Sequence, residues 1–371
     1  MTFMGMRAAG WFLSMVLFAG TSAVQASSAG QVRIYNWLEY MPADILEDFE
    51  QETGVSVQYD EYNSASVMEN KLLTGNSGYD VVFVSSTSLR KLIVAGAVLP
   101  LDYEKLANAN FLEPRFLQSL EAAGDQGNRH AVPYLWGATL IGYDAKRLDD
   151  VFPEGIPNTW DIIFKPEHLK QVANCGVGII DAPEEILPIA LYYLGFDPNT
   201  KSRREYRAAQ QLIQAIKPSI KYFDSQRYGV DLADGSICLG VGWSGGFVQA
   251  QQIARAAGHP SNIVMTVPEE GAPFWSDVMV VANKSANPDQ AHMFINYIMR
   301  PEVIARISQQ LGYPAPHKAH GVNQGSSDEQ DSRQMLMRSA EAQQFFTITP
   351  ASEPTERVRA RVWRSIKNTE Q

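Results

Sequence analysis

The sequence predicts an α/β protein built from two lobes. Short apolar runs of strand length alternate with amphipathic helical patterns along the chain, without internal repeats. This alternation is typical of strands that are joined by helices. About 345 residues follow a predicted leader segment, which is more than one hydrophobic core usually serves. We therefore expect the chain to divide into two units.

Residues 1–26 are predicted to be a signal peptide. Arg7 gives the segment a positive start, residues 11–18 are apolar, and small residues precede a cleavage site before Ser27. The apolar run is too short to cross a bilayer. Because Ser27 stands where a lipid-anchored protein would have cysteine, an N-terminal lipid anchor is not expected. The sequence predicts an exported, soluble protein.

The expected elements follow from periodicity and turn residues. Apolar runs predict strands at 55–59, 80–84, 138–143, 177–180, 237–241 and 278–282. One-sided apolar patterns predict helices at 44–52 and 288–299. A helix at 357–367 carries apolar residues at helical spacing, and we expect it to dock on its own domain rather than on a membrane. The sheets are expected to be mainly parallel.

Charge and cysteine content limit the function classes. Removal of the leader leaves 30 basic and 41 acidic side chains, a net charge near −11. An acidic protein binds nucleic acid poorly, because it repels the phosphates, and it binds cations more readily. The two cysteines, Cys175 and Cys238, predict one disulfide in an oxidising compartment. No Cys or His spacing indicates a metal site, and no cofactor is expected.

Aromatic residues next to acids recur at the ends of the predicted elements. Trp37, Glu39 and Tyr40 follow the first apolar run. Further along, Trp275 lies two residues before Asp277. Aromatic faces attract a cation and a carboxylate accepts its hydrogen bonds, so this pattern indicates a ligand with an apolar body and a positive charge.

Two further features follow predicted strands or helices. Asp181 and Glu184 have the spacing of a helix N-cap and its partner, which leaves Glu185 free at the carboxyl end of a strand. Tyr313 adds an aromatic side chain after another predicted helix. We interpret Glu185 and Tyr313 as additional candidates for ligand contact.

An exported serine esterase is the rival hypothesis. Residues 242–246 match the nucleophile-elbow pattern, with Ser244 at its centre, between a predicted strand and a predicted helix. Asp277 and either His292 or His317 would complete a triad in the required chain order. Against this hypothesis, no oxyanion-type glycine segment is present, and His292 lies inside a predicted helix.

Several ordered segments resemble the periplasmic putrescine/spermidine-binding proteins of ABC importers. The resemblance extends over residues 31–371. Its signatures are the segments 35–37, 49–54, 78–80, 181–185, 237–243 and 357–359.

The resemblance implies a two-lobe periplasmic binding protein of type II, with crossing hinge strands and a ligand cleft between the lobes. One lobe would take residues 31–134 and 261–312, and the other 135–260 and 313–371. It implies a monomer that captures a small cationic ligand in the periplasm and delivers it to an ABC permease in the inner membrane, without catalysis. The ligand contacts it implies are Trp37, Glu39, Tyr40, Ser85, Glu185, Trp243, Trp275, Asp277 and Tyr313.

The chain departs from the family pattern at four places. Leu38-Glu39 replaces the Ser-Asp pair of putrescine binders, and Trp275 replaces phenylalanine; Glu39 and Trp275 resemble the spermidine branch. Ala182 lacks that branch's acid, and Gly246 stands where the family has a further acid. A buried ammonium without a partner is costly, so the far end of the ligand need not be a primary amine. Spermidine, putrescine, agmatine and γ-aminobutyrate all stay open.

Overall fold

The computed structural model describes residues 1–2, 30–258, 262–318 and 327–368. Apart from residues 1 and 2, the predicted signal peptide at 1–26 lies outside these ranges. The strands are β1 Gln31–Trp37, β2 Ser56–Tyr62, β3 Val81–Ser85, β4 Ala131–Asp144, β5 Val177–Ile179, β6 Tyr222–Phe223, β7 Leu239–Trp243, β8 Ile263–Thr266, β9 Ala272–Val281 and β10 Phe345–Thr347.

Helices connect most of these strands. They are α1 Ala43–Thr53, α2 Ala65–Leu73, α3 Ser86–Val94, α4 Pro114–Ala122, α5 Ala145–Asp149, α6 Asp161–Phe164, α7 Pro166–Val172, α8 Pro183–Tyr193, α9 Arg203–Ile216, α10 Tyr228–Ala233, α11 Ser244–Ala256, α12 Pro288–Ile298, α13 Pro301–Leu311, α14 Ser327–Glu341 and α15 Glu353–Asn368. Each predicted strand and helix overlaps one of these elements. The α/β class is therefore confirmed.

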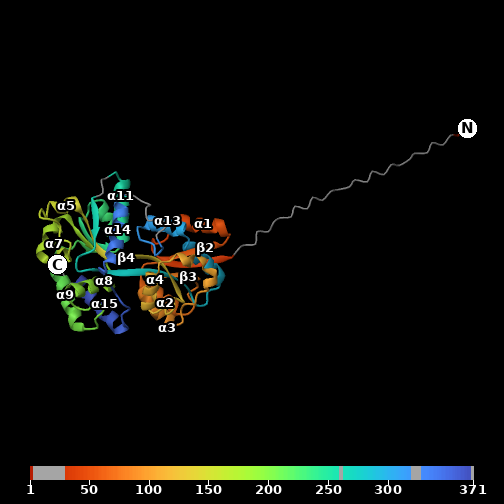
Figure 1. Ribbon diagram of the computed structural model, residues 1–371, viewed down its shortest axis with the longest axis horizontal. Helices are drawn as coiled ribbons and strands as arrows, with labels where there is room; N and C mark the ends of the chain where they lie inside the picture. The colour runs from red at the N-terminus through yellow and green to blue at the C-terminus, as the bar shows by residue number, and fades with distance from the viewer. Residues whose placement is uncertain (3–29, 259–261, 319–326, 369–371) are drawn as a thin grey trace.

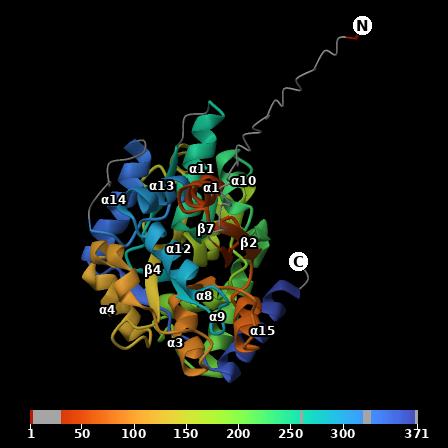
Figure 2. The same cartoon turned by 90° about the vertical axis from the view of Figure 1, so that its right-hand side faces the viewer.

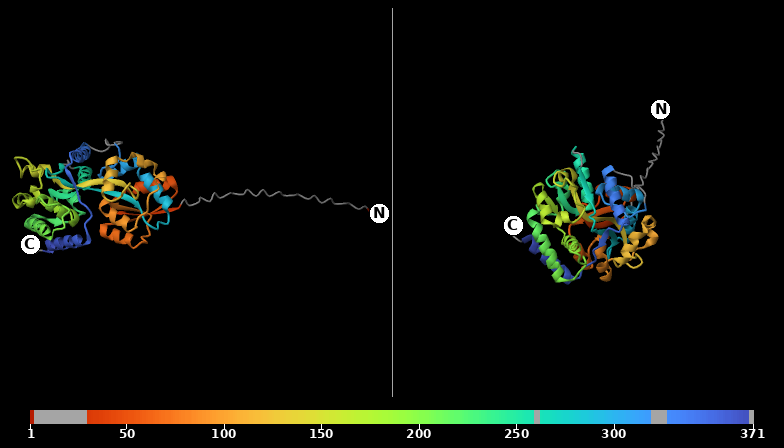
Figure 3. Two further views of the ribbon diagram at one scale, coloured as in Figure 1. Left: turned by 60° about the horizontal axis from the view of Figure 1, so that its bottom comes forward. Right: turned by 60° about the vertical axis from the view of Figure 1, so that its left-hand side comes forward.

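The elements gather in two groups with β4 running between them (Figure 1). Helices α1, α2, α3 and α13 lie in one group, and α5, α7, α9 and α15 lie in the other (Figure 1). A view turned about the horizontal axis separates the same two groups (Figure 3). The architecture therefore has two lobes. The exact lobe boundaries stay a prediction.

Two long strands join the lobes. The strand order is β2-β1-β3-β9-β4-β7-β5-β6, with β10 on β9 and β8 on β4. Strand β9 pairs with β3 and with the first part of β4, and β4 then continues to pair with β7 and β8. The register between β4 and β9 shifts between Pro133 and Trp136. These two strands form the crossing connection.

The prediction of mainly parallel sheets needs correction. Strands β1, β2 and β3 are parallel, as are β5, β6 and β7. The ladders that β4 makes, and the ladder between β3 and β9, are antiparallel. Strand β4 passes from one lobe into the other, and it runs antiparallel to β7 in the second sheet. The sheets are consequently mixed.

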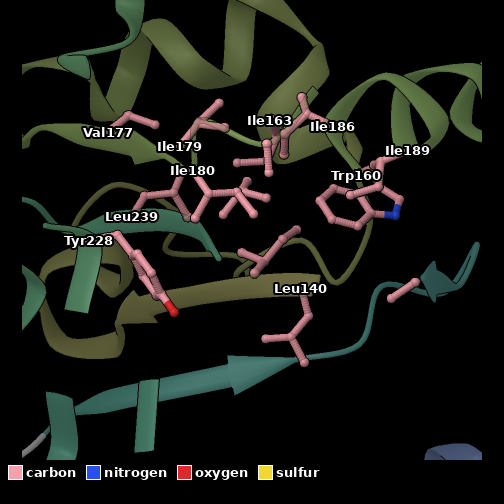
Figure 4. Packing of buried hydrophobic residues seen from close by; sticks show 14 of the residues in the cluster. Leu140, Trp160, Ile163, Val177, Ile179, Ile180, Ile186, Ile189, Tyr228 and Leu239 are labelled. Atoms are coloured by element: carbon pink, nitrogen blue, oxygen red, sulfur yellow. The ribbon is translucent and has the colours of Figure 1, made fainter. Parts of the chain in front are cut away.

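Each lobe has its own buried core. One core joins α1, α12 and α13 to the sheet of β1, β3 and β9, and a smaller cluster fills the opposite face beside α2 and α3. The other core packs α8, α9 and α11 on β5 and β7. Figure 4 shows part of it, with Ile179, Ile180 and Leu239 facing Ile163 and Ile186. Rigid cores of this kind can move as units around a shared connection.

The disulfide and the C-terminal helix agree with their predictions. Cys175 and Cys238 are bonded, with their Cα atoms 5.6 Å apart. Helix α15 buries Val362, Trp363 and Ile366 against its own lobe. Within the described ranges, no helix is long and apolar enough to span a membrane. In the same part of the chain, no three His, Cys, Asp or Glu side chains are arranged to hold a metal ion.

Candidate ligand-binding site

Several predicted contact residues lie at the end of a strand or in the first turn of a helix, and others lie within the crossing strand β9 or in connecting loops. Trp37 ends β1, Ser85 ends β3 and Trp243 ends β7. Glu185 lies in the first turn of α8, and Asp277 lies on the crossing strand β9 directly opposite Ser85. The carboxyl ends of parallel strands are where open α/β sheets bind ligands. Both lobes therefore direct candidate side chains to the region between them.

Asp277 is a buried carboxylate without a cationic partner among the described residues. It is 7% exposed, and burial raises its pKa to about 8. The negative charge of Glu185 adds to this rise, whereas the nearby Tyr40 hydroxyl and Trp37 indole N–H oppose it. Neither of these two donors makes a hydrogen bond of ordinary geometry. A buried carboxylate without a cationic partner is costly, so Asp277 is well suited to receive an ammonium.

Aromatic rings surround the carboxylate. Tyr40 packs edge-on against Tyr134 at 5.4 Å and against Tyr313 at 5.5 Å between ring centroids. Trp275 meets Tyr313 at 5.2 Å. The indole nitrogen of Trp275, like that of Trp37, is buried without a hydrogen-bond partner in the described chain. The rings form a wall suited to the methylene groups and the charge of an organic cation.

Glu185 has a different environment from Asp277. The Thr139 hydroxyl donates to one of its oxygens, and the Trp243 indole N–H donates to the other at 3.0 Å. Burial raises the pKa of Glu185, and both donors oppose the rise. Glu185 thus fixes the ring plane of Trp243. Thr139 was not among the predicted residues; the only sequence signal was its place in the predicted strand 138–143.

Glu39 and Ser85 lie at the margin of the cluster. Glu39 is exposed, has a left-handed backbone with φ 55°, and donates its backbone N–H to the Glu61 carboxylate at 2.8 Å. Ser85 is part-buried and accepts a hydrogen bond from the Thr87 N–H at 3.4 Å at the start of α3. Their contact with ligand stays a prediction.

A model of the family described as bacterial extracellular solute-binding protein matches residues 44–327. The chain belongs to this family. Putrescine-binding periplasmic protein SpuD of Pseudomonas aeruginosa strain UCBPP-PA14 is 37% identical over 98% of this solute-binding protein and 99% of SpuD. A putrescine/agmatine-binding protein of Pseudomonas aeruginosa strain PAO1 is 36% identical over 96% of this chain and 97% of that protein.

Solved structures agree on the fold. The TpPotD lipoprotein of Treponema pallidum superposes with a TM-score of 0.77 at 25% sequence identity, covering 91% of this chain and 99% of that one. The solute-binding protein thus has the two-lobe fold of type II periplasmic binding proteins, as its family resemblance predicted.

The residues of the rival esterase triad are engaged elsewhere in this solute-binding protein. Ser244 is fully buried and its hydroxyl accepts from the Ala138 N–H at 3.4 Å. His292 receives the Asp102 N–H on one ring nitrogen and contacts the Pro288 carbonyl with the other. The remaining candidate, His317, places its Nε2 against the Met299 carbonyl at 2.9 Å. A serine nucleophile needs a base within hydrogen-bond reach, and this geometry provides none from either histidine.

The predicted N-cap role of Asp181 in the solute-binding protein is wrong. Helix α8 starts after Ala182 without a side-chain cap, so Glu184 has no capping partner. Asp181 instead accepts from the Trp363 indole N–H at 2.5 Å and pairs with Lys367 at 2.7 Å. The Asp181 carboxylate therefore holds α15 against the lobe and does not cap α8.

Thr139→Val should weaken ligand binding about fivefold, because it removes one donor from Glu185 and leaves the shape of the side chain unchanged. A single hydrogen bond contributes roughly 1 kcal/mol. Titration calorimetry measures the affinity, and tryptophan fluorescence reports the freed indole of Trp243. Thr159→Val is the matched control, because it removes the same kind of hydroxyl-to-carboxylate hydrogen bond from Glu270, outside the predicted contacts. Unchanged affinity together with an unchanged spectrum would contradict the anchoring role.

Proposed function

We propose that this protein is the periplasmic solute-binding component of an ABC importer and that its ligand is a polyamine, putrescine or spermidine. The observation that carries the proposal is the buried Asp277 carboxylate, which lies among aromatic rings and has no cationic partner among the described residues. The ligands after which its relatives are named, putrescine and agmatine, are cations of matching chemistry.

The mechanism is capture without chemistry. Trp37, Trp243 and Trp275 stack on the methylene chain of the ligand, and Asp277 pairs with a terminal ammonium. Glu185 orients the Trp243 indole, and the exposed Glu39 adds negative charge at the margin of the site. Because ligand contacts come from both lobes, binding favours the closed form, which a membrane permease then recognises.

Binding in the absence of any cofactor is the direct test. Titration calorimetry with putrescine, spermidine, spermine, agmatine, cadaverine and γ-aminobutyrate should give heat of binding for the amines. γ-Aminobutyrate should bind weakly, because its carboxylate would approach Glu185 and Asp277. Binding of γ-aminobutyrate in preference to every amine would overturn the polyamine assignment.

Ser244→Ala should leave ligand affinity within a few-fold of wild type, because Ser244 is fully buried beneath the site. The same protein preparations should not hydrolyse an activated ester. Ser244-dependent turnover of such an ester would restore the esterase hypothesis and reject a purely binding function.

A further inference from the structure

Tyr228, which no sequence pattern singled out, holds the backbone of a predicted ligand contact. It is 4% exposed and begins α10. Its hydroxyl donates to the Trp243 carbonyl at 3.0 Å and accepts from the Trp243 N–H at 3.2 Å. Figure 4 shows the phenol at the edge of the aliphatic core. The Trp243 backbone is thus fixed by Tyr228, and its indole is fixed by Glu185.

Glycine residues make room for this phenol. A Cβ atom at Gly246 would lie 2.0 Å from the Tyr228 hydroxyl oxygen, and one at Gly242 would lie 2.4 Å from its ring. Gly246 has no positive φ, so the limit at this position is space and not backbone strain. Any side chain at 246 must displace Tyr228.

A second tyrosine, Tyr313, packs against the neighbouring Gly245. A Cβ atom at Gly245 would lie 2.4 Å from the Tyr313 ring. Helices α11 and α13 lie side by side, as the end-on view also shows (Figure 2), and Tyr313 follows α13 directly. Two phenol rings therefore cover the first turn of α11, where a longer side chain could otherwise enter the site.

We propose that Tyr228 is a positioning residue that sets ligand selectivity. It orients Trp243, and it occupies the space that a carboxylate-bearing side chain at position 246 would need. Of Asp277 and the part-buried Glu185, Asp277 alone lacks a protein donor of ordinary geometry, since Glu185 accepts hydrogen bonds from Thr139 and Trp243.

The ligand class follows from this arrangement, and this step rests on the proposed function. The site reads one primary ammonium by direct ion pairing and recognises the rest of the ligand by contact with the rings. Putrescine and 1-aminobutane differ only in the distal ammonium group. Wild type should therefore discriminate between these two amines by less than about tenfold, a modest preference for a second positive charge.

A double-mutant cycle at positions 228 and 246 tests both the role of Tyr228 and the inferred ligand class. The four proteins are wild type, Tyr228→Ala, Gly246→Asp and the double variant, each titrated with putrescine and with 1-aminobutane. Gly246→Asp alone should lower the melting temperature and weaken both amines. Combined with Tyr228→Ala, the new carboxylate has space, and the preference for putrescine over 1-aminobutane should rise about tenfold or more, as expected for a charge-assisted hydrogen bond.

Smaller substitutions keep the test valid if the aspartate variants do not fold. Gly246→Ala should lower the melting temperature in wild type, yet raise it or leave it unchanged in the Tyr228→Ala background, because alanine in an open helix position is favourable. Tyr228→Phe removes only the hydroxyl. It should weaken both amines equally and shift the Trp243 fluorescence, a change that a purely space-filling role would not produce.

The outcomes separate the inference from the proposed function. Additive effects of the two positions on melting temperature, or an unchanged amine preference in a folded double variant, would overturn the role of Tyr228. A wild-type preference for putrescine above about tenfold would overturn the inference that the site binds only one ammonium by direct ion pairing. If wild type binds no amine at all, the proposed function fails together with the ligand class, whereas coupling in melting temperature still reports on Tyr228 and Gly246.

Discussion

Asp277→Ala should weaken amine binding by about thirtyfold or more. The carboxylate is 7% exposed and has no cationic partner in the described chain, so a bound ammonium would be its counter-ion. Removing one member of a buried charge pair costs roughly 2–5 kcal/mol, because the other charge stays desolvated. Titration calorimetry with putrescine measures the loss. Near-wild-type affinity would show that the ammonium binds elsewhere.

Asp277→Asn separates lost charge from lost structure. A carboxylic acid whose pKa is raised in the fold makes the ionised folded state less stable, so stability falls as pH rises from the unfolded pKa near 4 to the folded value of about 8. The ligand-free asparagine variant should therefore melt above wild type by a small margin at pH 5 and by a larger one at pH 8. Glu47→Gln, at an exposed position outside the predicted contacts, is the control for a general loss of negative charge and should leave affinity unchanged.

Local patterns predicted the elements but not the course of the crossing strands. The strands near 138–143 and 278–282 were placed correctly, yet their antiparallel ladders arise because β4 and β9 pass between lobes. No local signal specifies which strand a chain will pair with after such a passage. The same limit applies to Asp181, whose partners Trp363 and Lys367 lie far along the chain.

The candidate site shows a similar division. Trp37, Asp277 and Trp275 were predictable from the sequence. They are large aromatic or acidic residues next to the ends of predicted elements, and these residue types suit a cationic ligand. Thr139 and Tyr228 act through other residues from within a strand and a short helix, and their residue types are ordinary there. In the sequence, Gly246 differs from the family pattern only by the absence of an acid. The close approach of Tyr228 that requires a glycine there depends on three-dimensional packing alone.

Amine affinity should rise with pH up to about pH 8, because the ligand-free Asp277 carboxyl titrates there. Burial is the main cause of its raised pKa, and Glu185 adds to it. The other groups that face it, Tyr40 and Tyr313, have their pKa values raised well above 10 and stay protonated. An ammonium binds the carboxylate form, so binding below pH 8 must release a proton. The apparent affinity should then increase about tenfold per pH unit between pH 6 and 7.

Proton release makes this linkage directly measurable. Calorimetry at pH 6.5 in buffers of different ionisation enthalpy should give close to one proton released per putrescine bound, and almost none at pH 9. Above about pH 9.5 affinity should fall again, as the ligand amines begin to lose their charge like lysine side chains. Asp277→Asn should remove the dependence between pH 6 and 8, whereas Glu185→Gln should retain it, because Glu185 is held by Thr139 and Trp243. A pH-independent affinity with no proton release in wild type would mean that Asp277 is already ionised before the ligand arrives, and its burial would then not be coupled to ligand capture.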